Sequence, residues 1–511
     1  MKRLFSIIPF FILISISLYV CAQNEHPNNF RYTNPVISGM APDPSVCGVG
    51  DDYYLVNSSF IQNPALPLYH SKDLIHGELI NYAVTSQNGL DLSKGIGMFA
   101  PTIRYNAQDS TFYVICTNVG CGQNFIVYTK NPRSKWSNPV WLKNPKFGID
   151  PSLFFDTDGS CYLQCTGNNN IIQAKINPKT GEELSEIKVI TEGLGGRYPE
   201  GPHLYKVDSY YYLMLSEGGT EFGHHVNMFR GTSPWGPFES YEGNPILSHV
   251  GKNAQNNPIQ CTGHADLIQA HDNSWWMVFL ASRPILWEFY PLGRETFLAP
   301  VEFTNDKWFT VNKTGTVDTA MLVATLPQVP KTTKNDITHT FDAPLSLEWN
   351  GYRVSPQSIT TIKNGKLQLS GSEAYDAFIG VRQLDYTMDA VTQVFLDKDG
   401  EAGLCVHHDD GKRYNLGWIK KDGKTYVQSQ CLFFSVNQSE QVQIDNKTKS
   451  CYLKISARKE MYYFYYSLDN KTWTEVGKMD AHFLAGGFSG LLVGPYSKKG
   501  NAEFEFCSFS Y

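Results

Sequence analysis

Hydrophobic residues in the first three hundred positions fall into short runs rich in aromatic side chains, and a polar turn precedes each run. Five of these runs resemble one another, and they occupy residues 52–56, 112–115, 161–164, 211–214 and 275–278. Their corresponding aromatic residues, Tyr54, Tyr113, Tyr162, Tyr212 and Trp276, are 59, 49, 50 and 64 residues apart. Units of this length, each predicted as several short strands, are typical of a β-propeller, in which every blade buries its faces against its neighbours. The pattern predicts a five-bladed β-propeller over residues 30–325.

A different pattern follows residue 325. Residues 326–335 are rich in Pro, Thr and Lys and poor in apolar side chains, which is typical of a linker. Alternating apolar and polar positions then return in strand-like runs at residues 366–369, 391–396, 452–455, 462–466 and 502–506, with Asp-Gly turns and no helical period. Residues 336–511 are therefore predicted to form a β-sandwich domain, and the whole chain is expected to be all-β.

The N-terminus has the features of a secretory signal peptide over residues 1–22. Two basic residues precede an apolar run at residues 4–20, and Cys21 and the small residue Ala22 follow it. A run of 17 residues is also near the lower limit for a membrane span, so an uncleaved anchor is the alternative. Tyr19 and Val20 are poor neighbours for a lipidated Cys21, which argues against a lipoprotein. We expect cleavage after Ala22, export to the periplasm or the medium, and no stable membrane insertion of the mature protein.

Composition narrows the function classes. A chain of 511 residues is too long for one hydrophobic core, which favours two domains. Its formal charge of −6 gives no reason to expect binding to nucleic acid or to an anionic membrane. Aromatic residues make up 14% of the chain, and such side chains both favour strands and stack on sugar rings. The oligomeric state stays open.

Ten cysteines remain after residue 22, without the spacing of a disulfide framework. The pairs Cys116 and Cys121, and Cys161 and Cys165, have spacings that a zinc site could use, but no histidine stands near them. Buried free thiols, or one or two local disulfides, are the simpler interpretation. We therefore predict neither a structural metal nor a cofactor.

Acidic residues precede three of the five aromatic positions at a nearly constant step. Counting back eleven or twelve residues leads to Asp43, Asp150 and Glu200, and in the other two repeats to Pro101 and His264. The first strand of each blade lines the central channel of a propeller, so these residues are expected to meet at one mouth. In a single Asp-Pro-Ser sequence, the Asp usually does no more than cap a turn before a strand. Two copies in phase, with Glu200 in a third repeat, favour a catalytic site.

Three carboxylates around one axis suit the hydrolysis of a glycosidic bond. That reaction needs one carboxylic acid to protonate the leaving oxygen and one carboxylate to activate water or to attack the sugar. A free Glu titrates near ~4.3, so the acid needs a raised pKa, and a neighbouring carboxylate raises it. The trio can supply an acid, a base and a residue that tunes the acid.

Four further residues could hold a sugar at the same mouth. Phe60 and Phe99 could form its walls, although ordinary blade packing is the competing interpretation for each. His264 could orient a carboxylate, bind a hydroxyl or hold an axial cation with water, or it could be a core histidine. Arg294 could reach the sugar or merely pair with Glu295.

The candidate residues stand in ordered motifs, namely Asp43-Pro44-Ser45, Ala100-Pro101-Thr102, Asp150-Pro151-Ser152, Glu200-Gly201-Pro202-His203, Thr262-Gly263-His264-Ala265-Asp266 and Gly293-Arg294-Glu295-Thr296-Phe297. Together they closely resemble the motifs of glycoside hydrolase family 43. The C-terminal half, with Gly403-Leu404-Cys405-Val406 and Gly490-Leu491-Leu492-Val493-Gly494-Pro495-Tyr496, is similar to the concanavalin-like β-sandwich of the family's β-xylosidases and α-L-arabinofuranosidases. The match covers nearly the whole mature chain.

The resemblance implies an inverting hydrolase. Asp43 would be the general base and Glu200 the general acid, while Asp150 would tune the pKa of the acid and orient it. In an inverting site the acid and the base stand ~6.5 to 9.5 Å apart, which leaves room for a water molecule.

The resemblance also implies a substrate. His264 and Arg294 would help form the subsite of the terminal sugar, with Phe60 and Phe99 on its walls. The sandwich would cap one side of the cleft and so favour exo action on hemicellulose oligosaccharides, releasing terminal α-L-arabinofuranose or β-D-xylose. Relatives commonly have Trp where Phe99 stands, so the preferred pentose stays open, as does any contribution of the sandwich to the pocket.

Two other functions compete with this one. A retaining fructan hydrolase would have Asn before its Asp-Pro, whereas Pro42 stands before Asp43 here. A noncatalytic glycan-binding propeller, with the sandwich as a lectin module, predicts the loss of at least one acid of the trio, and all three are present.

Overall fold

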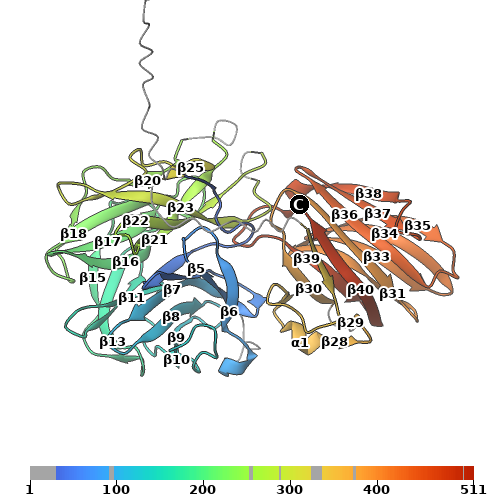
Figure 1. The fold of residues 1–511 in the computed structure, drawn as a ribbon, viewed down its shortest axis with the longest axis horizontal. Helices are drawn as coiled ribbons and strands as arrows, with labels where there is room; N and C mark the ends of the chain where they lie inside the picture. Colours follow the sequence, from blue (N-terminus) through green and yellow to red (C-terminus); the bar gives the residue numbers. More distant parts are fainter. Residues whose placement is uncertain are drawn as a thin grey trace, which may run out of the picture.

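The computed structural model describes residues 30–90, 97–251, 257–286, 289–323, 336–371, 376–498 and 500–511. Figure 1 shows two β-rich lobes, one from the N-terminal part of the chain and one from the C-terminal part. Helical segments are short: η1 (Ser86–Asn88), α1 (Pro356–Ile359) and η3 (Ala481–Leu484). No helix in the described ranges is long and apolar enough to cross a membrane. The signal peptide expected at residues 1–22 and the linker expected at residues 326–335 lie outside the described residues.

Five antiparallel sheets form the first lobe, which confirms the five-bladed propeller. Blade 1 consists of β2 (Ser45–Val49), β3 (Asp52–Val56), β5 (Ala65–Ser71) and β6 (Glu78–Val84). Blade 2 consists of β7 (Met98–Asn106), β8 (Thr111–Asn118), β9 (Gln123–Thr129) and β10 (Val140–Trp141). Blade 3 consists of β11 (Ile149–Phe155), β12 (Cys161–Thr166), β13 (Ile171–Asn177), β14 (Glu182–Glu183) and β15 (Lys188–Thr191). Blade 4 consists of β16 (Glu200–Val207), β17 (Tyr210–Glu217), β18 (His225–Gly231), β19 (Glu239–Ser240) and β20 (Leu247–Ser248). Blade 5 consists of β21 (Gln260–Gln269), β22 (Trp275–Ser282), β23 (Arg294–Phe303) and β24 (Phe309–Val311).

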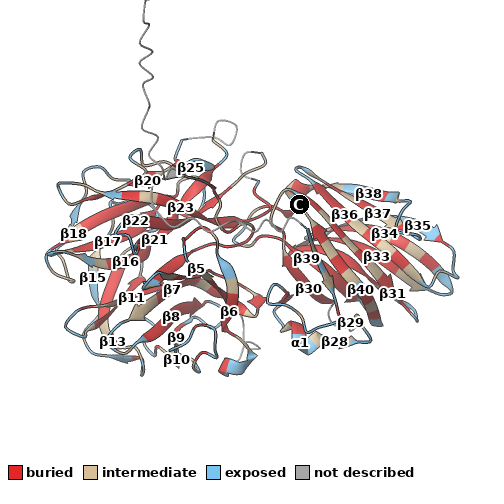
Figure 2. Ribbon diagram, viewed as in Figure 1, coloured by how far each residue is buried: buried red, intermediate tan, exposed pale blue. Residues whose placement is uncertain are grey.

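The repeated aromatic residues lie on the second strand of each blade. Tyr113 on β8 and Trp276 on β22 are almost fully buried, and so are all eight residues of β8. Figure 2 shows such buried residues along the strands inside each lobe and exposed residues mainly at the loops. Stacked blades remove both faces of a middle strand from water, which explains why these runs are almost continuously apolar rather than alternating.

The N-terminal segment closes the propeller. β1 (Phe30–Thr33) pairs antiparallel with β25 (Ala320–Val323). Farther along, the Asn34 side chain donates to the carbonyl oxygen of Leu298 (3.0 Å), and Ala41 N donates to the carbonyl oxygen of Arg294 (3.0 Å). The segment therefore follows β23 and carries the chain to Asp43 at the mouth of the channel.

Two eight-stranded antiparallel sheets form the second lobe, which confirms the predicted β-sandwich. The first contains β26 (Asp336–Thr340), β28 (Thr360–Lys363), β29 (Lys366–Gly371), β31 (Thr387–Phe395), β36 (Ser450–Arg458), β37 (Met461–Ser467), β38 (Thr474–Asp480) and β40 (Gly500–Ser510). The second contains β4 (Gln62–Asn63), β27 (Asn350–Tyr352), β30 (Ala377–Arg382), β32 (Gly400–Asp409), β33 (Lys412–Lys421), β34 (Lys424–Phe433), β35 (Val436–Ile444) and β39 (Leu492–Lys498). Buried residues alternate with less buried ones along β31, as expected of a strand with one face on the core.

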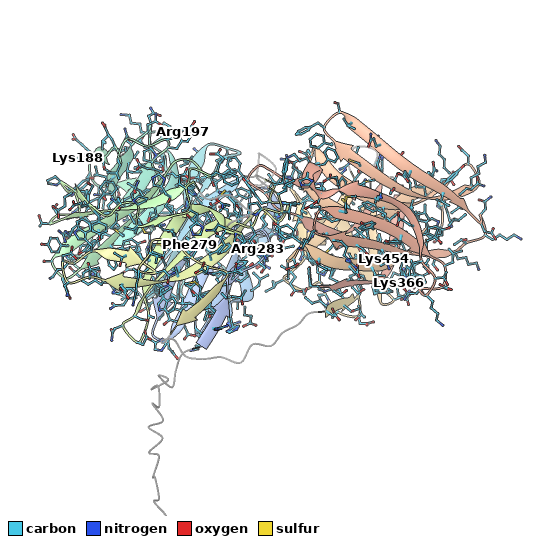
Figure 3. All side chains as sticks on the ribbon, turned by 90° about the horizontal axis from the view of Figure 1, so that it is seen from above. Lys188, Arg197, Phe279, Arg283, Lys366 and Lys454 are labelled. Carbon is cyan, nitrogen blue, oxygen red and sulfur yellow. The ribbon has the colours of Figure 1, made fainter. Side chains whose placement is uncertain are left out.

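The two lobes share a sheet. Strand β4 follows Phe60 in the propeller half of the sequence, yet it pairs with β27 at the edge of the second sandwich sheet. Arg382 Nη1 on β30 donates to the carbonyl oxygen of Met40 (3.2 Å), and the Tyr386 hydroxyl donates to the carbonyl oxygen of Arg283. Arg283 lies near the junction of the lobes in Figure 3. These contacts hold the sandwich against the side of the propeller that carries the chain toward Asp43.

Candidate active site

The inner strands of four blades contain a one-residue bulge. In blade 3 the pairing passes from Ile149–Thr166 to Ser152–Gln164, so that two residues of β11 oppose one of β12, and β7, β16 and β21 show the same irregularity. A residue with left-handed backbone follows at each bulge, and Asp43 stands at the matching place before β2; these residues are Asp43 (φ 50°), Ala100 (43°), Asp150 (53°), Gly201 (57°) and His264 (44°). Non-glycine residues rarely adopt this conformation, and it is often found where a fold positions functional side chains.

The structure shifts the repeat by one residue in two blades. Ala100 and Gly201, rather than Pro101 and Glu200, have the left-handed conformation in blades 2 and 4. Glu200 therefore directly precedes its bulge, and its side chain is 18% exposed, compared with 5% for Asp43. The three predicted acids do meet at one mouth of the channel, but Glu200 enters it from a different backbone position.

Asp43 is held as a carboxylate. The Ser58 hydroxyl donates to Oδ2 (2.5 Å), Arg294 Nη1 donates to Oδ1 (3.2 Å), and His264 Nδ1 lies 4.0 Å from Oδ1. Burial opposes ionisation of this carboxyl, but the charges of Arg294 and His264 and the Ser58 hydrogen bond outweigh it, so the pKa of Asp43 lies below its ordinary value. Asp43 is ionised at neutral pH.

Asp150 is the carboxyl that retains a proton. Its side chain is buried, and Gly201 N donates to Oδ2 (3.3 Å). Burial raises the pKa of Asp150 to about 7; His264 opposes the rise, whereas the nearby carboxylates of Glu200 and Asp43 add to it. Near neutral pH this carboxyl is partly protonated.

Glu200 behaves in the opposite way. Burial alone would raise its pKa, but His224 Nε2 lies 3.1 Å from Glu200 Oε1, and this partner, with His264, brings the pKa of Glu200 below its ordinary value. The raised pKa expected for the acid, Glu200, is therefore found at Asp150 instead, because no imidazole among the described residues contacts Asp150 in the way that His224 contacts Glu200. The pKa of Asp150 is thus raised and that of Glu200 lowered, so the two coupled carboxyls bind protons unequally.

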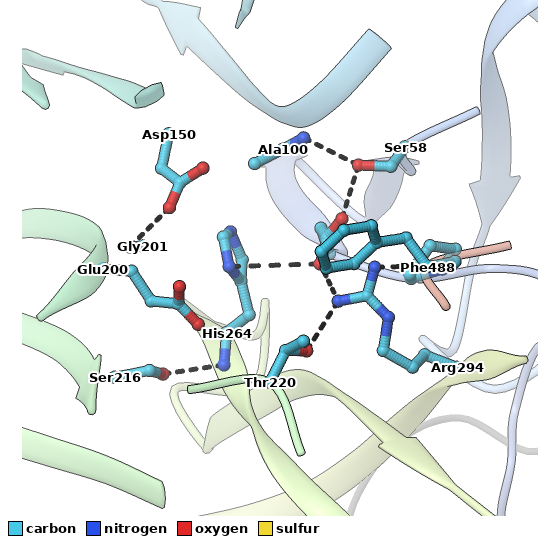
Figure 4. A network of polar contacts seen from close by, with 12 residues as sticks. Ser58, Ala100, Asp150, Glu200, Gly201, Ser216, Thr220, His264, Arg294 and Phe488 are labelled. Atoms are coloured by element: carbon cyan, nitrogen blue, oxygen red, sulfur yellow. Dashed lines mark hydrogen bonds and ion pairs between the residues drawn. The ribbon is translucent and has the colours of Figure 1, made fainter. Parts of the chain in front are cut away.

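His264 stands between the two halves of the site. Its backbone N donates to the Ser216 hydroxyl (2.7 Å), which anchors the bulge of β21 to blade 4. In Figure 4, Asp150 and Glu200 lie on one side of the His264 ring, and Arg294 lies on the other, where it binds Asp43. The base side and the acid side are therefore separated by an imidazole, with its polar ring atoms in the space between them.

Aromatic rings wall the Arg294 side. The ring centroids of Phe60 and Phe99 are 4.7 Å apart, and Phe488 lies 6.3 Å from the first and 5.6 Å from the second. The Arg294 guanidinium lies 5.7 Å from the Phe60 centroid and 5.4 Å from the Phe488 centroid. The sandwich thus contributes Phe488 to the site, and this residue, which is 50% exposed, has no counterpart among the sequence predictions.

A close backbone contact places Phe488. A Cβ atom at Gly490 would stand 2.2 Å from the carbonyl oxygen of Leu292, so only glycine allows the sandwich loop to approach the propeller this closely. Arg294 Nη2 also donates to the carbonyl oxygen of Phe488 (3.5 Å). The two sides of this contact are almost two hundred residues apart, so no pattern along the sequence shows that they meet.

The segment between β17 and β18 supplies two further residues that the sequence predictions lacked. Thr220 accepts a hydrogen bond from Arg294 Nη1 (2.7 Å), and His224 faces Glu200. A Cβ atom at Gly263 would lie 2.2 Å from the His224 ring, so the glycine before His264 leaves room for that imidazole. The glycine directly before His264 is the one feature of the sequence that is consistent with a second imidazole, that of His224, packed at this point.

A buried polar network fills the channel beneath the site. Arg104 donates to both carboxylate oxygens of Asp266 (2.7 and 3.0 Å), and the hydroxyls of Ser45 and Tyr205 donate to the same carboxylate (both 2.6 Å). Arg104 Nη2 also lies 2.9 Å from His203 Nδ1. These residues come from blades 1, 2, 4 and 5, so the network ties together the inner strands of four blades, among them β16, which presents Glu200.

Within the described ranges, no group of three or more His, Cys, Asp or Glu side chains is arranged to hold a metal ion. The ten cysteines after residue 22 are free thiols, and nine of them are buried. Burial raises the pKa of Cys161 and Cys116, which leaves these thiols protonated.

Comparison with known proteins agrees with this geometry. The sequence profile of the glycosyl hydrolases family 43 matches residues 32–309, and the profile of the beta xylosidase C-terminal concanavalin A-like domain matches residues 338–511. The chain belongs to glycosyl hydrolase family 43.

Relatives in this family match the chain over nearly its full length. The non-reducing end alpha-L-arabinofuranosidase BoGH43B of Bacteroides ovatus is 37% identical, covering 96% of this chain and 95% of that protein. A xylosidase/arabinosidase of Butyrivibrio fibrisolvens is 33% identical, covering 94% of this chain and 98% of that protein. The solved structure of the Bacteroides ovatus xyloglucan PUL GH43B has a TM-score of 0.87 at 35% identity, covering 94% of this chain and 99% of that one. Both lobes of this family 43 protein therefore have counterparts in its relatives.

Proposed function

We propose that this protein is an exo-acting, inverting glycosidase that releases one terminal pentose, α-L-arabinofuranose or β-D-xylose, from hemicellulose-derived oligosaccharides. The observation that carries the proposal is the ionised Asp43 on one side of His264 and the coupled, proton-holding carboxyls of Asp150 and Glu200 on the other. The relatives' names, an arabinofuranosidase and a xylosidase/arabinosidase, support a pentose as the sugar released. They give no support to a noncatalytic glycan-binding propeller. With export expected from residues 1–22, the enzyme would act outside the cytoplasm.

Asp43 is the proposed general base. It is charged, and its hydrogen bonds from Ser58 and Arg294 fix the orientation of the carboxylate. A water molecule beside it would lose a proton to Asp43 while its oxygen attacks the anomeric carbon from the face opposite the leaving group. The C–O bond breaks with inversion, and the departing oxygen takes a proton from the acid.

Glu200 is the proposed acid, and Asp150 its proton reserve. Glu200 has the more accessible carboxyl and borders a cleft of about 630 Å³ that the leaving part of an oligosaccharide could occupy. Asp150 holds the proton of the coupled carboxyls in the free protein. A glycosidic oxygen next to Glu200 favours the tautomer in which Glu200 carries that proton, because the protonated carboxyl donates a hydrogen bond to this oxygen and the carboxylate cannot. His224 then orients the carboxylate that remains.

His264, Arg294 and the three phenylalanines form the proposed subsite of the terminal sugar. Arg294 and the imidazole offer N–H groups to sugar hydroxyls, and Phe60 and Phe99 offer apolar surface to the ring. Phe488 narrows the site from the sandwich side, which favours an enclosed pocket that accepts a chain end over an open groove.

Two chromogenic substrates test the proposed function. Release of 4-nitrophenol from 4-nitrophenyl α-L-arabinofuranoside and from 4-nitrophenyl β-D-xylopyranoside should both be measured, with proton NMR of the first-formed sugar. Hydrolysis of at least one, with a product of inverted anomeric configuration, is expected, and the larger kcat/KM identifies the preferred pentose. A product of retained configuration, or no hydrolysis of either, would contradict the proposal.

The pH profile should reflect the coupled carboxyls. kcat/KM is expected to fall as the pH rises through about 7, because the Asp150 and Glu200 pair then loses the proton that the leaving oxygen needs. In Asp150→Asn this alkaline limb should move to lower pH, since Glu200 then titrates alone with a lowered pKa and without a neighbouring carboxylate. The measurement is kcat/KM on an unactivated pentose-terminated oligosaccharide across the pH range, because its leaving oxygen departs only when it is protonated. An unchanged alkaline limb in Asp150→Asn would show that Asp150 does not hold the proton.

Phe488→Ala tests the contribution of the sandwich. The change removes one wall of the aromatic group around Arg294, so we expect KM for the 4-nitrophenyl pentoside to rise by about tenfold, with a smaller change in kcat. Phe483→Ala is the matched control, because Phe483 is similarly exposed on the sandwich but packs against Phe433 instead. Equal effects of the two changes would argue against a role of Phe488 in the sugar site.

A further inference from the structure

The sandwich carries a second cavity, of about 500 Å³, that the proposed reaction does not use. It lies over β27, β30, β32, β33 and β39 and is lined by residues that include Tyr352, Phe378, His407, Arg413 and Asn415. Phe378 and Tyr352 belong to a small apolar cluster separate from the main sandwich core, so the cavity lies on the outer face of this sheet. We propose that this cavity is a binding site for a neutral saccharide.

Aromatic rings form one part of its lining. The imidazole of His407 is stacked on Phe378, with the planes inclined by 18° and the centroids 4.9 Å apart, and the Tyr352 ring lies 4.4 Å from His407 on centroids. Burial lowers the pKa of His407 to about 3, so the ring is neutral. The C–H face of a sugar ring packs well on such uncharged aromatic surfaces.

Polar groups form the other part. Arg413 Nη2 donates to Asp376 Oδ2 (2.9 Å), and Arg353 Nη2 donates to Asp410 Oδ2 (2.9 Å). These two guanidinium groups and two carboxylates cancel in formal charge. A ligand with a net charge would meet no excess of opposite charge here, whereas hydroxyl groups could both donate to the carboxylates and accept from the guanidinium groups.

An unsatisfied amide points to a missing ligand. Asn415 is 2% exposed, and its Nδ2 donates to Gln430 Oε1 (3.3 Å), but its Oδ1 has no hydrogen-bond partner among the described residues. The Nε of Arg413 is also buried and unpartnered. Buried polar atoms are normally paired, and these two unpaired atoms belong to residues that line one cavity, so a small shift of either side chain toward the cavity would let it bind a group that both donates and accepts, such as a sugar hydroxyl.

The size and place of the cavity fit an oligosaccharide-processing protein. Its volume is within the range of small-molecule sites and exceeds that needed for one sugar ring. The lining residue Arg353 also donates from its backbone N to the carbonyl oxygen of Ile61 (2.8 Å), next to Phe60 of the active site. A saccharide bound here would hold the protein on its polysaccharide close to the seam of the two lobes. Only the choice of a xylan-type probe rests on the proposed function.

Affinity electrophoresis of the full chain tests the site. The Glu200→Gln protein would be run in native gels with and without soluble neutral arabinoxylan, together with the same protein carrying Val354→Trp or Tyr352→Ala. Val354 is a partly exposed residue of the cavity wall, so a tryptophan there can fill the cavity without entering the core. We expect the apparent Kd for arabinoxylan to rise at least tenfold in both variants.

Val436→Trp is the matched control, since Val436 is 46% exposed on β35, at the opposite edge of the same sheet from β27 and β4. The apparent Kd of this variant for arabinoxylan should stay within twofold of that of the Glu200→Gln protein. The three sandwich changes, made in the wild-type chain, should leave hydrolysis of the small chromogenic substrates within twofold, which separates this site from the proposed function. The proposal would be overturned if arabinoxylan did not slow the migration of the Glu200→Gln protein, or if Val354→Trp left that retardation unchanged. Stronger retardation by polygalacturonate than by arabinoxylan would also overturn it.

Discussion

Asp43→Asn is expected to lower kcat/KM by about 10³-fold on both an activated 4-nitrophenyl pentoside and an unactivated oligosaccharide. The asparagine preserves the size of the side chain, and its one carbonyl oxygen can still accept one of the two hydrogen bonds that Ser58 and Arg294 donate, but it cannot take a proton from water. Because every turnover needs an activated water, the quality of the leaving group should make no difference to the loss. The measurement is kcat/KM on the two substrate types at the pH optimum of the wild type.

Asp52→Asn is the control for that experiment, since Asp52 belongs to the same blade but pairs with Lys72 and His70 at the surface. It should keep full activity. Added azide should restore turnover of Asp43→Asn on the activated substrate and give a glycosyl azide of inverted configuration, because a small anion can replace the activated water. Activity of Asp43→Asn within tenfold of the wild type would rule out Asp43 as the base.

Glu200→Gln is expected to separate the two substrate types. An unactivated oligosaccharide should lose about 10²-fold to 10⁴-fold in kcat/KM, because its leaving oxygen departs only when it is protonated. A 4-nitrophenyl pentoside should lose far less, since nitrophenolate can leave without a proton.

Glu242→Gln, a change at an exposed glutamate of blade 4, is the control and should leave both substrates unaffected. Equal losses on the two substrates would contradict the assignment of Glu200 as the acid. A loss confined to KM would instead indicate that Glu200 only binds the sugar.

The sequence repeat accounts for much of the site, because a propeller converts an equal step along the chain into an equal place around an axis. Asp43, Asp150 and His264 stand at the same backbone position of three blades, and counting from the aromatic strand finds all three. Glu200 also stands twelve residues before its aromatic residue, Tyr212, but the structure places it one residue before that backbone position, so the count found the residue without matching its place in the blade.

Other parts of the site left no repeat to follow. His224 lies in a loop between strands, and its 3.1 Å contact with Glu200 depends on the space above Gly263. Phe488 reaches the site only because the sandwich docks against residues 292–293 of the propeller. Likewise, β4 is two residues long and reads as a propeller turn, and its place in a sandwich sheet depends on the partner strand β27.

The sequence by itself determined the all-β architecture, the number of blades and the meeting of three acids and a histidine at one mouth, because hydrophobic periodicity and the phase of a repeat are local properties. The tertiary structure alone decided which acid keeps the proton. Asp43, Asp150 and Glu200 are all carboxyls near His264, yet Arg294, burial and His224 respectively set their pKa values apart. Those effects act through a few ångströms of space between residues far apart in the chain, where no sequence pattern records them.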